Sequence, residues 1–362
     1  DFIDMARDAG CGAIVVDEPR RGRDWVALGA VATLPPHFGC KELLETLEAH
    51  VPQITRADRA PALEDDVTAD LGWRAPLLAV TGPGGTGAST VAVALAQGLA
   101  DDVRSGGAIV LADFRHRAEL AMLHDARDMV PGVQELAEAC RAGRPTLEEV
   151  RSLTYRVPER GYHLLLGLRR PREWTSVRPR AFYTAVDVLR TSFRYVIADV
   201  GPDVEGEDDI GSLDVEERNT MSRTTLQAAD AVFVVGNGGM KGTHAAAAVV
   251  SALVQFGIPP ARIVVVVNRS PRSASRRAEI RTCVQHLVGD AASSMPSPVF
   301  LPDRHVDDAF RDAVRLPDVL VAPLVAASHL VIDGPSPAPE ASRPRLVRPG
   351  LLGHWAPELE TQ

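Results

Sequence analysis

The sequence predicts a doubly wound α/β domain with a mainly parallel sheet and helices on both of its faces. Three observations lead to this prediction: a series of short, continuously apolar runs, helical segments that alternate with them between residues 76 and 332, and a glycine-rich turn directly after the first run. Runs that are apolar throughout are typical of strands buried on both faces of a parallel sheet. Alternation of strands and helices favours the doubly wound arrangement, whose ligand lies beyond the carboxyl ends of the strands.

The expected strands are short and rich in valine, isoleucine and leucine, and they are residues 77–80, 108–113, 162–168, 195–200, 231–236, 262–268 and 299–302. The expected helices lie between these strands, and the last of them precedes a proline-rich tail. These helices are 89–100, 132–142, 145–153, 178–193, 216–228, 243–256, 274–288, 305–314 and 317–330.

Three segments flank the main domain, which we place at 75–332. The pattern of residues 1–51 predicts a partial α/β segment, which is too small for a core of its own. Its expected elements are a helix at 1–9, strands at 13–18 and 26–34, and a helix at 41–50. Residues 52–74 combine charge and proline without a sustained period and are interpreted as a linker. Residues 333–362 are interpreted as a disordered tail because of their proline content.

Bulk composition excludes several classes of protein. The net charge of −9 and the pI near 5.6 argue against a general nucleic-acid-coating protein, which needs a basic face, and no specific nucleic-acid binding is indicated. The cysteines Cys11, Cys40, Cys140 and Cys283 lack metal-ligand spacing and are interpreted as reduced thiols. The sequence shows no signal peptide and no apolar run of membrane-spanning length, so a cytoplasmic location is expected.

Residues 81–90 read TGPGGTGAST and resemble a phosphate-binding loop, or P-loop, of the pattern G-x-x-x-x-G-K-[ST]. Gly82 and Gly87 hold the two glycine places and Ser89 holds the Ser/Thr place, but Ala88 stands where the pattern has lysine. The alternative is a glycine-rich strand-to-helix turn without a ligand. Of the 39 lysines and arginines in the chain, only Lys41 and Lys241 are lysines.

The loop retains the features that bind phosphate without a side chain. Its glycines allow backbone N–H groups to turn inward, and the following helix adds the positive end of its dipole. The hydroxyl of Ser89 is a suitable ligand for Mg²⁺ beside a β-phosphate. The nucleotide-binding residues predicted here are Gly82, Gly84, Gly85, Thr86, Gly87, Ala88, Ser89 and Thr90.

The loop and the strand pattern resemble the ParA/MinD family of P-loop ATPases, whose loop reads x-K-G-G-x-G-K-[ST]. Both lysines of that pattern are absent, because Pro83 holds the early position and Ala88 the later one. The variant GGxGAST is similar to the CpaE/TadZ branch of high-GC bacteria, which is associated with the septum site or with Flp pilus (Tad) secretion. That branch also carries a receiver-like domain before the ATPase domain, and residues 1–51 resemble its back half.

The resemblance assigns two further residues, Asp113 and Asp199, to the nucleotide site. The strand 108–113 ends in Asp113, which matches the first Asp of the family's D-x-D motif, but Arg115 replaces the second, water-positioning Asp. Asp113 is therefore either a ligand of a metal-bound water or a cap of its strand end. For Arg115 we expect a solvated side chain, with a phosphate contact as the alternative.

Asp199, at the end of the strand 195–200, matches the Walker B Asp and is expected on the metal side of the site. The predicted metal residues are thus Ser89, Asp113 and Asp199. The acidic segment 203–219 that follows is interpreted as a solvated loop.

A second group of residues is expected near the base. In ParA/MinD relatives an Asn at the position of Asn268 hydrogen-bonds the adenine, and a turn-forming Asn is the alternative. Arg269 follows Asn268 at the same strand end, and Pro302 and Asp303 match the family's late loop, commonly Pro-x-Asp or Pro-Asp followed by a helix, which the resemblance places against the base. Lys241 lies in a glycine-rich loop, where it either substitutes for the missing lysine or is a plain surface residue.

The resemblance implies a regulatory or localisation factor with a degenerate ATP site, ATP and Mg²⁺ as cofactors, and at most weak hydrolysis. The alternatives are an active partitioning ATPase and a nucleotide-free scaffold. Partners would be proteins of a division or pilus machinery that recruit the chain to a pole, the septum or the inner face of the membrane. A homodimer is implied, which the loss of a lysine at Pro83 would weaken. The tail offers Leu351, Leu352 and Trp355 for docking a partner, and its prolines and glycines argue against a membrane-binding helix.

Overall fold

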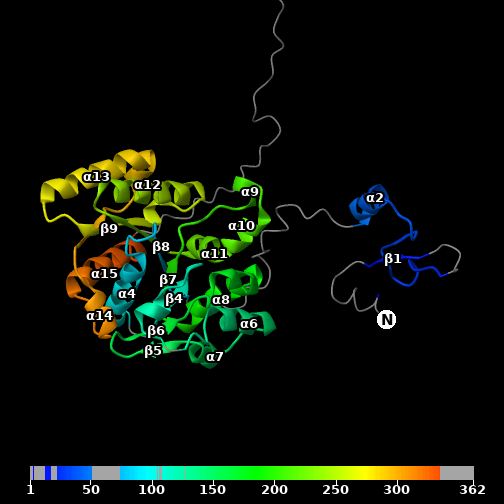
Figure 1. Cartoon of the computed structure of the whole chain (residues 1–362), viewed down its shortest axis with the longest axis horizontal. Coiled ribbons are helices and arrows are strands. Elements are labelled where there is room, and N and C mark those ends of the chain that lie inside the picture. The colour runs from blue at the N-terminus through cyan, green and yellow to red at the C-terminus, as the bar shows by residue number, and fades with distance from the viewer. Residues whose placement is uncertain are drawn as a thin grey trace, which may run out of the picture. The chain divides into compact units, whose positions relative to one another are not determined.

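The computed structural model describes residues 3, 13–17, 23–50, 74–103, 105, 108–126 and 128–334. The chain divides into two compact units, Asp1–Gly72 and Trp73–Gln362, and each is described by itself (Figure 1). The expected helix at 1–9 apart from Ile3, which is helical, nearly all of the linker and most of the tail lie outside the described residues.

In the described residues from 13 to 50, the first unit contains two parallel strands and one helix. Strand β1 (Ile14–Val16) pairs with β2 (Ala32–Leu34), and helix α2 (Cys40–His50) follows. The expected strand at 26–34 is therefore wrong in its first half. The backbone turns there, since the N–H of Gly29 donates to Val26 O at 2.9 Å and Gly29 has a φ of 99°.

The second unit is built on an eight-stranded sheet in the order β10-β9-β8-β3-β7-β4-β6-β5. All strands expected in this domain are present, and every pair except β5–β6 is parallel. The doubly wound fold class is thus confirmed. The strands are β3 (Leu77–Thr81), β4 (Ile109–Phe114), β5 (Tyr155–Val157), β6 (Tyr162–Leu165), β7 (Tyr195–Val200), β8 (Ala231–Asn237), β9 (Ile263–Ser270) and β10 (Val299–Pro302).

The helices lie where alternation requires, with some differences in their bounds. They are α4 (Ala88–Asp101), α5 (Leu120–Leu123), α6 (Val133–Ala142), α7 (Leu147–Ser152), α8 (Pro179–Ser192), α9 (Glu207–Ile210), α10 (Leu213–Arg218), α11 (Thr220–Ala228), α12 (Met240–Gln255), α13 (Ala274–Val288), α14 (Asp307–Arg311) and α15 (Asp318–Ile332). The acidic segment 203–219 is not a plain loop, since it contains α9 and α10. No helix within the described ranges is long and apolar enough to cross a membrane.

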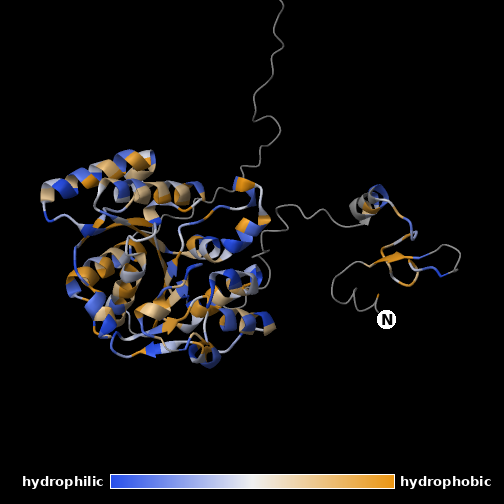
Figure 2. Ribbon diagram, in the orientation of Figure 1, coloured by the Kyte–Doolittle hydropathy of each residue, from blue (hydrophilic) through white to orange (hydrophobic). Residues whose placement is uncertain are grey.

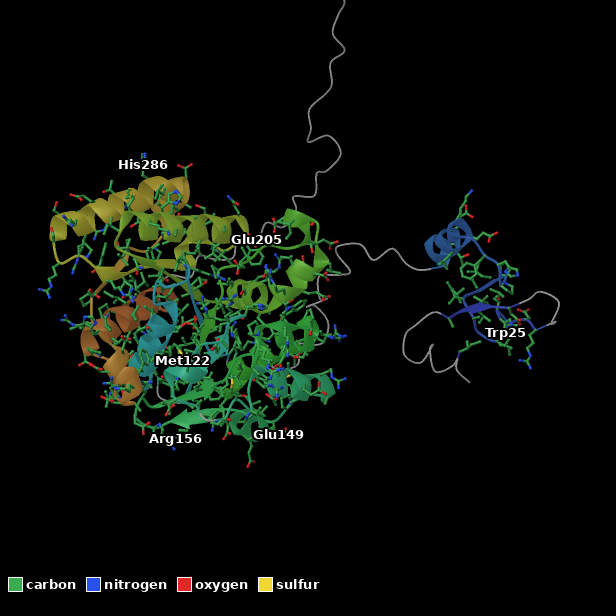
Figure 3. The ribbon with its side chains drawn as sticks, in the orientation of Figure 1. Trp25, Met122, Glu149, Arg156, Glu205 and His286 are labelled. Atoms are coloured by element: carbon green, nitrogen blue, oxygen red, sulfur yellow. The ribbon has the colours of Figure 1, made fainter. Side chains whose placement is uncertain are left out.

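Two hydrophobic cores lie on the two faces of the sheet. Successive strand residues point to opposite faces, so Leu77 and Ala79 of β3 pack with α6, α8, α11 and α12, whereas Leu78 and Val80 pack with α4 and α15. Figure 2 shows the resulting pattern, with hydrophobic strands inside and hydrophilic residues on the outer faces of the helices. Polar side chains such as Glu149 and His286 point away from the sheet (Figure 3).

Helix α4, which follows the glycine-rich loop, is fixed tightly between the sheet and α15. A Cβ on Gly98 would lie 2.4 Å from Val321 Cγ1, so the two helices approach closely at this glycine. The buried side chain of Gln97 donates to Leu316 O at 3.0 Å and accepts from Leu316 N at 2.8 Å. These contacts fix the C-terminal half of α4, the helix that continues from the loop.

Candidate nucleotide-binding site

The residues assigned to the site meet at the carboxyl edge of the sheet. Strand β7 lies between β3 and β4, and in this register Asp199 is the partner of Val80 on one side and of Asp113 on the other. The glycine-rich loop begins directly after Val80, at Thr81. The loop and the two aspartates are therefore neighbours, as the expected parallel topology requires.

The loop has the backbone conformation that its glycines allow. Gly85 and Gly87 have φ values of 77° and 87°, which side-chain-bearing residues rarely adopt. Gly82 lies against the neighbouring strand, because a Cβ there would be 2.3 Å from Val235 O. The hydroxyl of Thr86 donates to Pro83 O at 2.7 Å and closes the turn. Gly87 then forms the N-cap of the fourteen-residue helix α4.

The residues of the loop differ in exposure. Gly84 and Gly85 are exposed, whereas Thr86, Ala88 and Ser89 are buried and Thr90 is half-buried. The exposed backbone at Gly84 and Gly85 is the part of the loop that is open to a ligand. Ala88 offers no charge in this position.

Asn268 holds the loop from the neighbouring end of β9. Its Nδ2 donates to Thr86 O at 2.9 Å, and its Oδ1 accepts from Arg269 N at 2.9 Å. Arg269 has a φ of 50° and is exposed. Both ends of the Asn268 amide are thus engaged within the protein, and a contact with adenine would have to replace or share one of these bonds.

Asp113 is engaged by the backbone that follows its strand. One carboxylate oxygen accepts from Arg115 N at 3.2 Å, and the other accepts from Glu119 N at 3.0 Å and Leu120 N at 2.9 Å. Burial, followed by the charge of Asp199, raises the pKa of Asp113 to about 7. This geometry matches the alternative in which Asp113 caps its strand end.

Arg115 is not solvated, and that expectation is wrong. Its side chain is 16% exposed, and its Nη1 lies 3.2 Å from Oδ1 of the fully buried Asp199. A weaker contact joins Nη1 to Val200 O at 3.5 Å. The sequence could not indicate this pair, because its members come from two strand ends 84 positions apart.

Asp199 is fully buried, and its surroundings shift its pKa. Burial raises the pKa of its carboxyl group, and the charge of Arg115 partly offsets this shift. In the described part of the chain, its Oδ2 is buried without a hydrogen-bond partner.

In this arrangement the donor set does not fit a magnesium ion well. Mg²⁺ requires near-octahedral oxygen coordination, yet the guanidinium of Arg115 already occupies one oxygen of Asp199 and the oxygens of Asp113 accept backbone N–H groups. Within the described residues, no group of three His, Cys, Asp or Glu side chains gathers as a metal site. Ser89 and Asp199 Oδ2 remain as the oxygens that a metal would find.

The remaining predicted residues lie at the same edge of the sheet. Pro302 ends β10 and is the partner of Ser270 on β9, and the exposed Asp303 follows it. Lys241 is exposed in the first turn of α12. The acidic segment is tied down by Asn219, whose Nδ2 donates to the backbone oxygen of the exposed Glu205 at 2.9 Å (Figure 3).

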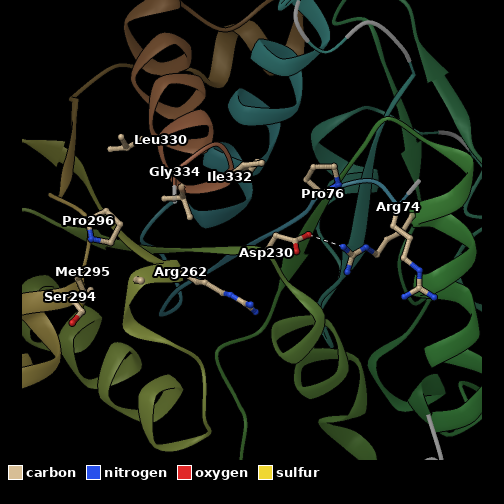
Figure 4. Close-up of a pocket in the computed structure, with 13 residues that line it drawn as sticks. Arg74, Pro76, Asp230, Arg262, Ser294, Met295, Pro296, Leu330, Ile332 and Gly334 are labelled. Carbon is tan, nitrogen blue, oxygen red and sulfur yellow. Dashed lines mark hydrogen bonds and ion pairs between the residues drawn. The ribbon is translucent and has the colours of Figure 1, made fainter. Parts of the chain in front are cut away.

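A separate cavity of about 440 Å³ lies at the opposite, amino edge of the sheet, next to Pro76 before β3 and Arg262 before β9 (Figure 4). Its central ion pair joins Arg190 Nη2 to Asp230 Oδ2 at 2.8 Å. Arg190 also donates to Ala75 O and Ala228 O, both at 2.9 Å. Because these groups satisfy one another, the pair connects the strand starts and does not belong to the nucleotide site.

No family model matches the chain, and no curated protein matches it in sequence. Solved structures do match. A ParA family ATPase from Chlorobium tepidum has a TM-score of 0.52 at 15% identity and covers 72% of this chain and 98% of its own. The cell division ATPase MinD from Pyrococcus furiosus has a TM-score of 0.52 at 16% identity, with 70% and 99% covered. A McdA variant from Cyanothece, solved with ATP, has a TM-score of 0.51 at 15% identity, with 73% and 99% covered. The chain therefore has the fold of the MinD and ParA ATPases.

Proposed function

We propose that this chain is a regulatory or localisation factor of the MinD/ParA type that binds ATP in a degenerate site and hydrolyses it weakly or not at all. The observation that carries the proposal is the glycine-rich loop itself. It has a formed cradle, with Gly85 and Gly87 in the left-handed region and an N-cap at Gly87, but Ala88 replaces the lysine.

Nucleotide binding is supported by the part of the loop that needs no side chain. Backbone N–H groups at the start of a helix form an anion site together with the helix dipole. Here the helix is α4, whose position is fixed by the contacts of Gln97 and Gly98. Ser89, in its first turn, adds a hydroxyl. Asn268, which donates to Thr86 O, holds the loop itself, and a cradle held in this way is preorganised for a polyphosphate.

Weak hydrolysis is supported by two independent changes. Ala88 removes a point charge from the β/γ-phosphates, and Arg115 replaces a carboxylate with a group that cannot accept a proton. Loss of one preorganised stabilising group costs on the order of 10²–10³ in rate. Together the two changes favour a slow switch or a nucleotide-gated platform.

The sequence variant GGTGAST supports a place in the CpaE/TadZ-like branch, with a role at the septum site or in Flp pilus and secretion positioning. The partner would then be a protein of that machinery. Pro83 in place of the early lysine favours a dimer that forms weakly or without nucleotide. Analytical ultracentrifugation with and without ATP tests this point, and a strong dimer induced by ATP would contradict it.

The experiment that tests the function is calorimetric titration of ATP into the full chain and into the Ala88→Lys variant, together with a phosphate-release assay. Micromolar binding with release well below about 1 per second, at the low end of common turnover numbers, supports the proposal. Binding only after Ala88→Lys would indicate a scaffold that gave up its ligand. Rapid release by the unmodified chain would indicate an active partitioning ATPase.

A further inference from the structure

We infer that Arg115 takes the place of the divalent cation in this site, so that a nucleoside triphosphate binds here without Mg²⁺. This inference rests on the proposed nucleotide binding and adds the identity of the group that neutralises the phosphates. It follows from the mismatch between the donor set and a magnesium ion.

The first ground for this inference is the position of Arg115. It follows β4, and its guanidinium contacts the carboxylate of Asp199 at the end of the adjacent β7. Asp199 is the register partner of Val80, the last residue but one of β3, from which the loop departs. The cation is thus placed beside the carboxylate that would otherwise face a metal.

The second ground is the chemistry of the guanidinium group. Arginine presents five N–H donors in a planar fork that suits phosphate oxygens. Only Nη1 of Arg115 makes a side-chain hydrogen bond with the described residues, to Asp199 and Val200. The side chain is 16% exposed, so the remaining donors are held in place but not all enclosed.

The third ground is the charge that Arg115 brings to the site. Compared with an aspartate at this position, an arginine changes the local charge by two units, which equals the charge of one Mg²⁺ ion. A magnesium ion beside Asp199 would meet a guanidinium of like charge at close range, and the two would repel. The site therefore has room for one of the two cations, and the chain supplies its own.

One oxygen of Asp199 favours the competing outcome, in which a metal ion binds at this site. Oδ2 of Asp199 is buried without a hydrogen-bond partner in the part of the chain that the structure describes, and together with Ser89 it offers oxygens to a metal. A metal bound there would make ATP affinity depend on Mg²⁺. The experiment is designed to separate these two outcomes.

The test is calorimetric titration of ATP into the full chain, once in excess EDTA and once in excess MgCl₂. We expect dissociation constants that agree within about threefold. We expect Arg115→Gln to weaken binding in EDTA by about tenfold or more, and Arg115→Lys to recover part of it as a point charge. Arg117→Gln, which removes an exposed arginine of the same loop, is the matched control and should leave affinity unchanged.

A complementary variant tests the replacement in the other direction. Arg115→Asp should bind ATP only when Mg²⁺ is present, because the site then lacks its own cation. Binding of the unmodified chain that is lost in EDTA, or an Arg115→Gln variant with unchanged affinity in EDTA, would overturn the inference while leaving nucleotide binding intact. Absence of ATP binding under both conditions would overturn the proposed nucleotide binding as well.

Discussion

Asn268 occupies the space that any side chain at Gly87 would need. Its Nδ2 lies 2.5 Å from the place of a Cβ on Gly87, and the same atom donates to Thr86 O at 2.9 Å. Gly87 also has a φ of 87°. The loop therefore depends on glycine at this position for two reasons, its backbone conformation and its close contact with the end of β9.

The first prediction compares two glycines of the loop. Gly87→Ala should destabilise the fold by about 1–2 kcal/mol through left-handed strain alone and should weaken ATP binding by about tenfold or more. Gly84→Ala is the control, because Gly84 has open space around its Cβ position and no positive φ. Urea unfolding and calorimetry measure both effects. Equal ATP affinity of the two variants would show that the loop shape does not matter for binding.

The second prediction separates the two roles of Asn268. If the amide holds the loop, Asn268→Ala should lower stability by about 1–2 kcal/mol, the range for lost hydrogen bonds, and should weaken ATP and GTP to the same degree. A direct contact with the adenine would instead reduce the preference for ATP over GTP. Parallel titrations with the two nucleotides distinguish these results. Loss of ATP affinity alone would favour the adenine contact expected from the resemblance.

A half-buried histidine gives the molecule a defined response to pH. His124 Nδ1 lies 2.7 Å from Leu120 O and must donate to it, so Nε2 accepts from the Tyr162 hydroxyl at 2.7 Å. This tautomer is neutral. Burial is the main cause that lowers the pKa of His124 from 6.5 to about 4.

The third prediction follows from this shift. Because the folded protein binds the proton less readily than the unfolded chain does, protonation favours unfolding once the pH falls below 6.5. The free energy of unfolding should fall by about 2 kcal/mol between pH 7 and pH 5 on account of His124. A His124→Gln variant should lack this component. Urea unfolding at a series of pH values gives the free energy of unfolding of each protein against pH, and the difference between the two curves isolates the contribution of His124. Parallel curves would show that His124 titrates normally.

The fourth prediction concerns the anchor of α4. Gln97→Met keeps the approximate volume but leaves the buried N–H and C=O of Leu316 without partners, which should cost about 2–4 kcal/mol in unfolding free energy. Gln285→Met on the exposed face of α13 is the matched control and should stay within about 0.5 kcal/mol of the parent. A mild effect of Gln97→Met would mean that water replaces the lost bonds.

The sheet could be predicted from sequence because its strands are buried on both faces and therefore read as unbroken apolar runs. β5 was missed for the opposite reason. It is a three-residue edge strand whose central Arg156 is exposed, so neither length nor apolarity indicated it. The expected helix at 216–228 is divided at Asn219 because its side chain bonds to the backbone of Glu205, a contact that no local pattern reveals.

The site was predictable to the extent that it follows from topology. Strand ends of a parallel sheet meet at one edge, so Asp113, Asp199 and Asn268 were expected near the loop, and they lie there. The direction of their side chains was not predictable. Arg115 was expected in solvent, and only the register between β4 and β7 shows why it turns to Asp199 instead.

The last prediction asks whether the two altered positions account for slow hydrolysis. Ala88→Lys should strengthen ATP binding and raise phosphate release only slightly, because Arg115 still occupies Asp199 and cannot orient a water molecule. Arg115→Asp alone should restore metal dependence without the charge at the β/γ-phosphates. The double variant should release phosphate faster than either single variant, by on the order of 10²-fold, in the presence of Mg²⁺. The gain should be non-additive, since the groups act on one transition state. A double variant that binds Mg²⁺ and ATP but stays as slow as the parent would show that a further part of the catalytic site is missing, and would turn attention to Pro83 and the dimer.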